Sequence, residues 1–435
     1  MSVELIGLAG VVLLLLLIAL RVPISFAMML VGIIGFSMIR TPSAALSMAS
    51  SELFSTFSSY SLSVIPMFIW MGYIAYYSGV GTSLYQFAYK MVGHKRGGLA
   101  IATQAACALF GAICGSNTAT AATIGAIALP EMRKYGYNDS LSTASVAAGG
   151  ALGVLIPPSV IFIVYGIATE QSVGKLFFSG IIPGILLMLF YMLTIYIIVR
   201  RNPEFGPAGA KSGWKERIDA LRGGLLEVIL TFCISLGGLF AGWFTPTEAG
   251  AVGAVSIFVI TLIRRRLSWE GFKKSLMETT RTTAMIMLMV AGAMIFGRFI
   301  AVSRLPAAMA TWASGLNLPP VMVLMIILMI YALLGCIIDA LALILLTIPI
   351  FYPVAVNVLG YNPIWFGVVI VLVVALGVIT PPVGMNVFVI KGVVPDVPLE
   401  KIFKGVWPFV AALIACIIVL ILFPQLVLFL PDLLM

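Results

Sequence analysis

The chain has 435 residues, of which 62% are hydrophobic and only 9% are charged. Long apolar runs recur from end to end, which is the composition of a polytopic α-helical membrane protein and excludes a soluble domain. The net charge of +9 does not indicate a nucleic-acid partner, because Lys and Arg lie in short loops between the apolar runs. The surroundings we expect are a lipid bilayer.

Ten segments are predicted to cross the membrane: 3–20, 22–38, 61–78, 140–168, 180–199, 224–241, 247–263, 282–300, 363–390 and 406–423. The first is expected to be a retained helix, because it lacks the basic region and cleavage site of a signal peptide. Segment 42–60 is rich in Ser around Leu53, Phe54 and Phe57, and it is predicted to be an interfacial amphipathic helix.

Two further apolar regions, 98–130 and 320–351, are interrupted at their middles by small polar residues. We interpret both as re-entrant helical hairpins. If the N-terminus is outside and each of the ten segments crosses once, only Arg40, Lys175, Arg298 and Arg304 of the 25 Lys and Arg residues lie in or toward the outside. This asymmetry favours an external N-terminus.

The second half of the chain repeats part of the first at an offset of 224 residues. The recurring runs are Gly136-Tyr137-Asn138 with Gly360-Tyr361-Asn362, Ala151–Val154 with Ala375–Val378, and Pro157-Pro158 with Pro381-Pro382. With five crossings in the first half, the second half starts from the opposite side of the membrane. The prediction is therefore an inverted repeat, with residues 1–200 and 224–435 as the two copies and 201–223 as a cytoplasmic linker.

Each copy contains a double proline inside an apolar segment, which predicts a discontinuous helix over 140–168 and another over 363–390. Proline has no N–H, so Pro157 and Pro158 are expected to leave the carbonyls of Gly153 and Val154 unpaired. In the second copy, Pro381 and Pro382 are expected to do the same to the carbonyls of Gly377 and Val378. Unpaired carbonyls in apolar surroundings are ligands for Na⁺ in sodium-coupled carriers. The alternative is a plain proline kink with hydrated carbonyls.

The hairpin tips carry the polar groups of the apolar regions. The first tip, residues 111–120, offers the small polar side chains of Ser116, Asn117, Thr118 and Thr120. These groups suit a cation or a carboxylate, although a small-residue helix-packing face has the same composition. The second tip, residues 335–339, ends in Asp339, a membrane-depth carboxylate and therefore a candidate functional residue. The alternatives for Asp339 are a helix N-cap or an ion pair with an arginine.

Two other charged residues need an interpretation. Arg298 lies toward the outer interface, where it either extends to the headgroup region or contacts an anionic substrate or Asp339. Glu248 is expected to cap the helix that begins at Thr247. The chain has one histidine and five scattered cysteines without a CxxC pair, so we expect no enzyme, no metal centre and no cofactor.

Several runs in order resemble the large membrane subunit of TRAP (tripartite ATP-independent periplasmic) transporters. They are Ser116–Ala119, Leu152–Ser159, Phe178–Gly184, Thr245–Ala249 and Gly377–Gly384. The resemblance implies an elevator-type, sodium-driven carrier of organic anions in the bacterial inner membrane. It also implies two partners, which are a small four-helix membrane subunit and a soluble periplasmic substrate-binding protein.

The resemblance also implies site residues. One sodium site would involve Ser116, Asn117, Gly153, Ile156 and Pro158. A second would involve Gly335, Ile338, Asp339, Gly377, Thr380 and Val383. The residues that we expect to contact the substrate are Asn117, Thr118, Ser159, Arg298 and Asp339.

The nearest alternative function is a stand-alone sodium/dicarboxylate symporter that needs no binding protein. A channel is less well supported, because two hairpins that open to opposite sides suit alternating access. A membrane enzyme has the least support.

Overall fold

The computed structural model describes residues 2–315 and 318–434, and every regular element in these two ranges is helical. Up to the linker the helices are α1 (Val3–Ala19), α2 (Ile24–Ile39), α3 (Pro42–Phe57), η1 (Tyr60–Ser63), α4 (Val64–Tyr77), α5 (Val80–Val92), α6 (Gly98–Cys114), α7 (Asn117–Lys134), α8 (Asp139–Gly150), η2 (Ala151–Val154), α9 (Val160–Ala168) and α10 (Val173–Arg201). The rest are η3 (Pro203–Phe205), α11 (Trp214–Ala220), η4 (Leu221–Leu225), α12 (Leu226–Phe240), α13 (Pro246–Ile263), α14 (Trp269–Val302), α15 (Leu305–Gly315), α16 (Pro320–Gly335), α17 (Ala340–Tyr352), η5 (Pro353–Val358), α18 (Pro363–Ile379), α19 (Met385–Val393), α20 (Leu399–Leu422) and α21 (Gln425–Leu434). The all-α prediction is confirmed.

Each of the ten predicted crossings corresponds to a helix or to a helix pair. Among the described residues, five helices are long and apolar enough to span a membrane by themselves, or six if α3 and η1–α4, which bend by 49°, count as one span. Four of the five are predicted crossings, namely α10, α13, α14 and α20. The fifth is Ala340–Val358, the return arm of the predicted second hairpin. Because this arm is long enough to cross, the re-entrant assignment stays a prediction.

Both predicted hairpins are helix–turn–helix units, and both predicted discontinuous helices are broken at the double proline. The first hairpin consists of α6 and α7 and the second of α16 and α17. The breaks separate α8–η2 from α9 and α18 from α19.

Residues related by the 224-residue offset have the same structural roles. Asn138 caps α8 by accepting a hydrogen bond from the backbone of Ser140, and Asn362 caps α18 by accepting one from Ile364. The glycine two residues before each cap has a positive φ, 72° at Gly136 and 74° at Gly360. The repeat found in the sequence is therefore also a repeat of local structure.

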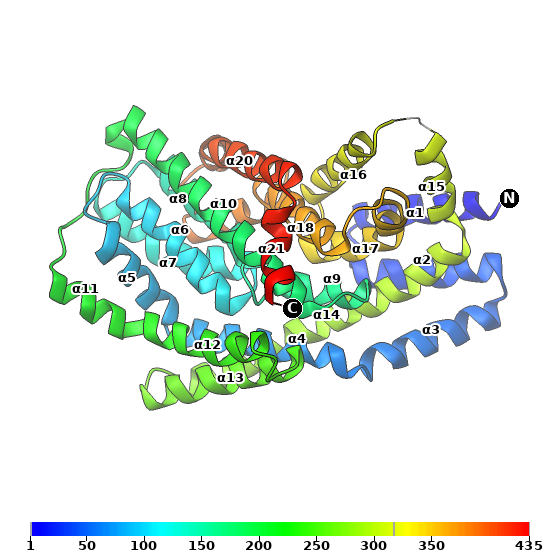
Figure 1. The fold of residues 1–435 in the computed structure, drawn as a ribbon, viewed down its shortest axis with the longest axis horizontal. Coiled ribbons are helices and arrows are strands. Elements are labelled where there is room, and N and C mark those ends of the chain that lie inside the picture. Colours follow the sequence, from blue (N-terminus) through cyan, green and yellow to red (C-terminus); the bar gives the residue numbers. More distant parts are fainter. Residues whose placement is uncertain (1, 316–317, 435) are drawn as a thin grey trace.

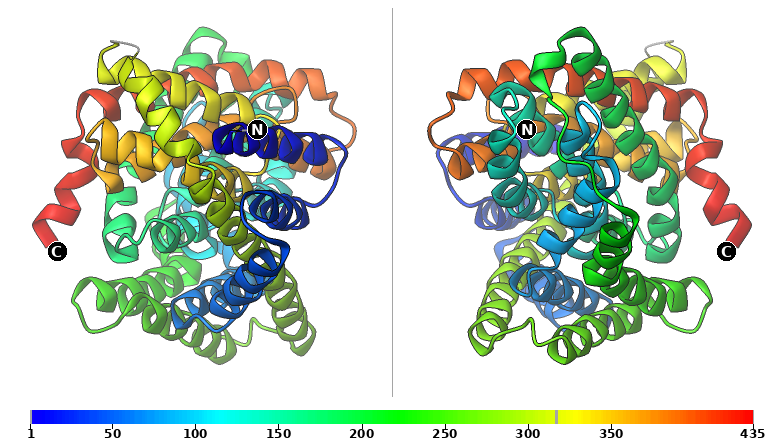
Figure 2. Two further views of the ribbon diagram at one scale, coloured as in Figure 1. Left: turned by 90° about the vertical axis from the view of Figure 1, so that its right-hand side faces the viewer. Right: turned by 90° about the vertical axis from the view of Figure 1, so that its left-hand side faces the viewer.

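In Figure 1 the two helical hairpins lie toward opposite ends of the molecule, above a row of helices along its lower edge. Helices α3, α4, α12 and α13 line the lower edge in that view, with the first hairpin and α8 above them at one end and α16 and α17 at the other. The long helix α14 packs on α2, α3 and α4 and also touches α17. The end-on views of Figure 2 show α12 and α13 on the outside of the helices that carry the hairpins.

Some elements were not predicted. The sequence did not indicate helices α5, α15 and α21, and the linker contains α11, which an ion pair of 2.7 Å between Lys90 and Glu216 ties to α5. Segment 42–60 is helical as predicted, and α3 buries one face that includes Glu52. Its interfacial position stays a prediction.

A network of ion pairs joins the two repeats beside the broken helices. Arg133 at the end of α7 contacts Asp396 at 2.6 Å and Asp139 at 3.4 Å, and Lys401 of α20 contacts Asp139 at 2.9 Å. The hydrogen bond from Arg133 holds the pKa of Asp396 below its ordinary value. These contacts connect the first hairpin and α8 of the first repeat with α20 of the second.

Candidate functional site

The first tip is a tight turn against the first broken helix. Gly115 ends α6 with φ at 60°, and a Cβ at this position would lie 2.5 Å from the carbonyl oxygen of Pro158. Ser116 then caps α7, because its hydroxyl accepts a hydrogen bond of 3.4 Å from the backbone of Ala119. Only glycine fits this turn, because φ is positive here and because the backbone closely approaches Pro158 of the first broken helix.

The polar atoms of the first tip converge on the break in the helix. A Cβ on Gly153 would lie 2.5 Å from the hydroxyl of Thr120 and 2.6 Å from the carbonyl oxygen of Ser116. In the described ranges, the carbonyls of Gly153 and Val154 accept no hydrogen bond, as the prolines predict. The structure therefore brings Ser116, Gly153 and Pro158 together in one cluster at the first tip.

The remaining first-site candidates lie on either side of this cluster. Asn117 begins α7, and its side-chain oxygen accepts a hydrogen bond of 2.8 Å from the backbone of Thr118. Ile156 lies within the break and directs its side chain onto Gly184 of α10. Only the backbone of Ile156 is thus available to the cluster.

The second tip packs on the second broken helix in the same way. Gly377 lies directly against the Gly335 carbonyl group, with no room for a Cβ. The thiol of Cys336 lies 3.2 Å from the hydroxyl of Thr380, and the backbone N–H of Val383 donates to the Cys336 carbonyl at 3.3 Å. Of the predicted second-site residues, Gly335, Gly377, Thr380 and Val383 are therefore neighbours. The Gly335–Gly377 contact lies at offset 224 from the Gly111–Gly153 contact of the first tip.

One expectation about the second break is wrong. The carbonyl of Gly377 is not unpaired, because it accepts hydrogen bonds from the backbone N–H of Thr380 at 3.3 Å and from its hydroxyl at 3.4 Å. The turn after α18 brings Thr380 back over the last helical carbonyls. The Thr380 hydroxyl, which also donates to Leu376 at 2.8 Å, therefore satisfies part of the second break.

Asp339 is a helix cap. Its carboxylate accepts a hydrogen bond of 3.1 Å from the backbone of Leu341 at the start of α17. Within the described ranges no basic side chain pairs with Asp339, so the arginine alternative is not what the structure shows. The cap leaves a carboxylate whose negative charge is not matched by a cationic side chain.

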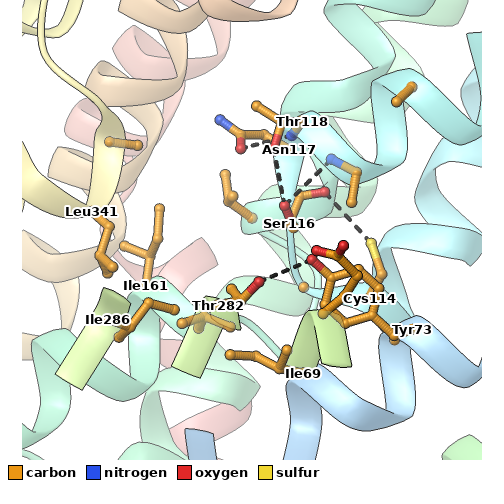
Figure 3. A pocket seen from close by; sticks show the side chains of 18 of the residues that line it. Ile69, Tyr73, Cys114, Ser116, Asn117, Thr118, Ile161, Thr282, Ile286 and Leu341 are labelled. Carbon is orange, nitrogen blue, oxygen red and sulfur yellow. Dashed lines mark hydrogen bonds between the residues drawn. The ribbon is translucent and has the colours of Figure 1, made fainter. Parts of the chain in front are cut away.

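Both tips line one cavity of about 580 Å³, which we call the tip cavity (Figure 3). Ser116, Asn117 and Thr118 contribute from the first tip and Asp339 from the second. Two predicted substrate contacts are absent from its described lining. Ser159 is fully buried as the cap of α9, and Arg298 pairs at 2.6 Å with Glu52 of α3.

The opposite wall of the tip cavity comes from α4 and α14, which sequence reasoning did not assign to the site. Tyr73 of α4 and Thr282 of α14 share a hydrogen bond of 3.0 Å across this wall (Figure 3). Glu278 lies one helical turn before Thr282 and also lines the cavity. Every residue from Glu278 to Thr283 is polar, so the sequence contains no signal that singles out these two residues.

The charges of the tip cavity are one-sided. Its described lining contains two carboxylates, Asp339 and Glu278, and no Lys, Arg or His. Uncompensated acids together with unpaired carbonyls favour the binding of hard cations. The fold and this cavity define a helical membrane transporter with repeated hairpins and broken helices.

A family model described as "Tripartite ATP-independent periplasmic transporter, DctM component" matches residues 11–426. The chain belongs to this family, so the predicted TRAP resemblance is confirmed. It is therefore a transporter permease and a multi-pass protein of the membrane, in a system whose family name is tripartite.

Two relatives indicate the range of substrates in the family. The C4-dicarboxylate TRAP transporter large permease protein DctM of Pseudomonas aeruginosa is 39% identical, over 88% of this chain and 88% of the relative. The sialic acid TRAP transporter large permease protein SiaM of Vibrio cholerae is 33% identical, over 94% of this chain and 95% of the relative.

A solved structure shares the fold. The YdaH transporter of Alcanivorax borkumensis superposes with a TM-score of 0.65 over 88% of this chain and 90% of that chain. Its sequence identity is only 15%, so this likeness supports the fold alone.

Proposed function

We propose that the protein carries out sodium-coupled uptake of an organic acid with a carboxylate or sulfonate group, delivered by a periplasmic binding protein. The observation that carries this proposal is the charge of the tip cavity, which has two carboxylates and no basic side chain in its described lining. An anion that enters such a cavity without cations faces both desolvation and repulsion. Bound Na⁺ ions remove both obstacles.

The coupling ions have two candidate sites. At the first tip, the oxygens of Ser116, Asn117, Gly153, Ile156 and Pro158 are the candidates. At the second tip, the candidates are Gly335, Ile338, Asp339, Gly377, Thr380 and Val383. The substrate then binds between the tips, where Asn117 and Thr118 supply donors beside the two cations.

The proposed motion is an elevator movement. The two hairpins and the two broken helices form the moving unit, and α4, α13 and α14 belong to the scaffold on which the small membrane subunit docks. Support comes from the tip cavity, which lies between polar groups of the tips and a wall of α4 and α14. Movement along this wall would carry the tips and their ligands together.

Gly297 of α14 and Pro349 of α17 provide a test of this motion. A Cβ on Gly297 would lie 3.8 Å from that of Pro349, which is a favourable separation for a disulfide. Cross-linking Gly297→Cys to Pro349→Cys should stop transport, and reduction should restore it. A control cross-link within the scaffold, Gly250→Cys with Met67→Cys, whose Cβ atoms would lie 3.2 Å apart, should leave transport active. Full transport activity of the protein cross-linked between Gly297→Cys and Pro349→Cys contradicts the elevator movement.

The sodium requirement and the partners are tested together. The chain, the small membrane subunit and the binding protein are placed in proteoliposomes with an inward sodium gradient and no ATP. Uptake should stop when either Na⁺ or the binding protein is omitted. Unchanged uptake without Na⁺ overturns sodium coupling. Uptake without the binding protein favours the alternative, a stand-alone sodium/dicarboxylate symporter.

A further inference from the structure

The scaffold wall of the tip cavity presents one face of each of two helices. On α14 the lining residues recur at the spacing of a helical face: Glu278, Thr282, Met285, Ile286 and Met289. On α4 they recur in the same manner: Ile69, Gly72, Tyr73, Tyr76 and Tyr77. The wall is therefore continuous, and Glu278 is its acidic residue.

The carboxylate of Glu278 forms no ion pair in the described ranges, either with Lys274 four residues before it or with Arg281 three residues after it. Among the residues that the structure describes, no basic side chain lies within 4.0 Å of it. Lys274, one turn earlier on the helix, pairs with Glu270 at 2.7 Å. Tyr73, Tyr76 and Tyr77 face the same space from α4 and carry no charge at neutral pH. The negative charge of Glu278 therefore acts on the cavity.

Glu278 and Asp339 occupy different positions along the tip cavity. Asp339 belongs to a hairpin tip, whereas Glu278 lies in the third turn of α14, beside the C-terminal end of α4. The distribution of Lys and Arg predicts that these ends of α4 and α14 face the cytoplasm. The tip cavity in this structure then extends from the tips toward the cytoplasmic side.

We propose that Glu278 is a release residue, whose fixed charge makes the cytoplasmic end of the tip cavity unfavourable for an anion and favourable for a cation. This inference rests on the proposed function, because it assumes an anionic substrate and the predicted orientation. On the scaffold, the charge stays in place while the tips move. It would then act on the substrate only when the tips are at this wall, which promotes departure of the anion and exit of Na⁺ toward the cytoplasm.

The inference is tested with charged thiol reagents, which need no knowledge of the substrate. Met285 lines the tip cavity and is 57% exposed, so Met285→Cys is placed in a full-length chain whose five cysteines are replaced. Inside-out membrane vesicles are treated with sulfonatoethyl methanethiosulfonate, an anion, or with its trimethylammonium analogue, a cation. The ratio of the two modification rates, relative to that of a free thiol, measures the local potential.

The expected result is a preference for the cation that falls about three- to tenfold in Glu278→Gln, the size expected for a partly screened unit charge nearby. The matched control is Glu270→Gln combined with Lys274→Gln, which removes an ion pair of zero net charge from the same helix, outside the described cavity lining, and frees no lysine to pair with Glu278. It should leave the ratio unchanged. Added salt should reduce the preference in the parent and change little in Glu278→Gln.

Three outcomes overturn the inference: an unchanged ratio in Glu278→Gln, an equal fall in the control variant that lacks the Glu270–Lys274 pair, or modification of Met285→Cys only from the periplasmic side. None of these measurements involves transport. A protein that passes them and yet takes up its substrate without Na⁺ contradicts the proposed function alone, so the two failures are distinguishable.

Discussion

The first tip is built from neutral oxygen atoms, whereas the second tip carries a full negative charge. Around Ser116, hydroxyl, amide and carbonyl groups meet the unpaired carbonyls of the first broken helix. Around Asp339, the carboxylate is the main polar group, and Thr380 already satisfies part of the second break. The backbone contacts are repeated between the two tips, but the electrostatics are not.

This difference separates two ways to hold a cation at membrane depth. A neutral cage of oxygens remains tolerable when the ion leaves, because hydroxyls and carbonyls bond to one another or to water. A carboxylate without a cation is costly in the same place. The second tip should therefore depend more strongly on its ion, and loss of its charge should have the larger effect.

Asp339→Asn should have the largest effect. The change removes the only charge of the second tip, which is the anionic partner of the proposed Na⁺. We expect transport to fall by about 100-fold, since removing one partner of a buried charge pair costs about 3 kcal/mol or more. Sodium-driven uptake by membranes with equal amounts of protein measures it. Asp396→Asn, which alters an exposed ion pair with Arg133, is the control and should retain activity. Near-normal uptake by Asp339→Asn would show that capping α17 is the whole role of this residue.

Gly377→Ala and Gly153→Ala should both reduce stability, by about 1–3 kcal/mol each, because a Cβ overpacks the contact between tip and broken helix. The effect should be larger for Gly377→Ala, where the clash is with the backbone of Gly335, than for Gly153→Ala, where part of it is with the movable hydroxyl of Thr120. Thermal unfolding in detergent measures this. Gly392→Ala, which meets no atom within 4 Å, should be harmless, and an equal loss there would contradict the packing argument.

Ser116→Ala should weaken the apparent affinity for Na⁺ by about fivefold, since one neutral hydrogen-bonding or ligand oxygen contributes about 1 kcal/mol. The measurement is the Na⁺ concentration that gives half-maximal uptake. Ser172 caps α10 in the same manner, outside the described lining of the tip cavity. Ser172→Ala therefore loses only a helix cap, and its Na⁺ concentration for half-maximal uptake should equal that of the parent protein. Equal shifts in both variants would assign the effect to helix capping.

Arg298→Ala should have the smallest effect on function. Its partner Glu52 is buried, so we expect a loss of about 1 kcal/mol of stability, limited by the 62% exposure of the Arg298 side chain. Substrate affinity should not change. Arg298→Ala combined with Glu52→Gln should recover the lost stability. A marked fall in substrate affinity in the stable double variant would support the predicted contact between Arg298 and the substrate.

Much of this architecture was predictable because its signals are local. Apolar segments of membrane length predict helices wherever the backbone must be satisfied internally. The double prolines predict the two breaks, and Gly153 shows the expected unpaired carbonyl. Repetition at a fixed offset predicted that the tips and broken helices would occur as matched pairs.

Other features depend on residues that are distant in the sequence, and only the folded chain decided them. Thr380 donates a hydrogen bond to the Gly377 carbonyl because the turn after α18 folds its backbone N–H back toward the end of the helix. Arg298 meets Glu52 because α3 packs across α14. Glu278 became a cavity residue only when α4 and α14 formed the wall opposite the tips. Hydropathy and proline chemistry act within a segment, whereas the choice of partner for a polar side chain depends on which helices pack together.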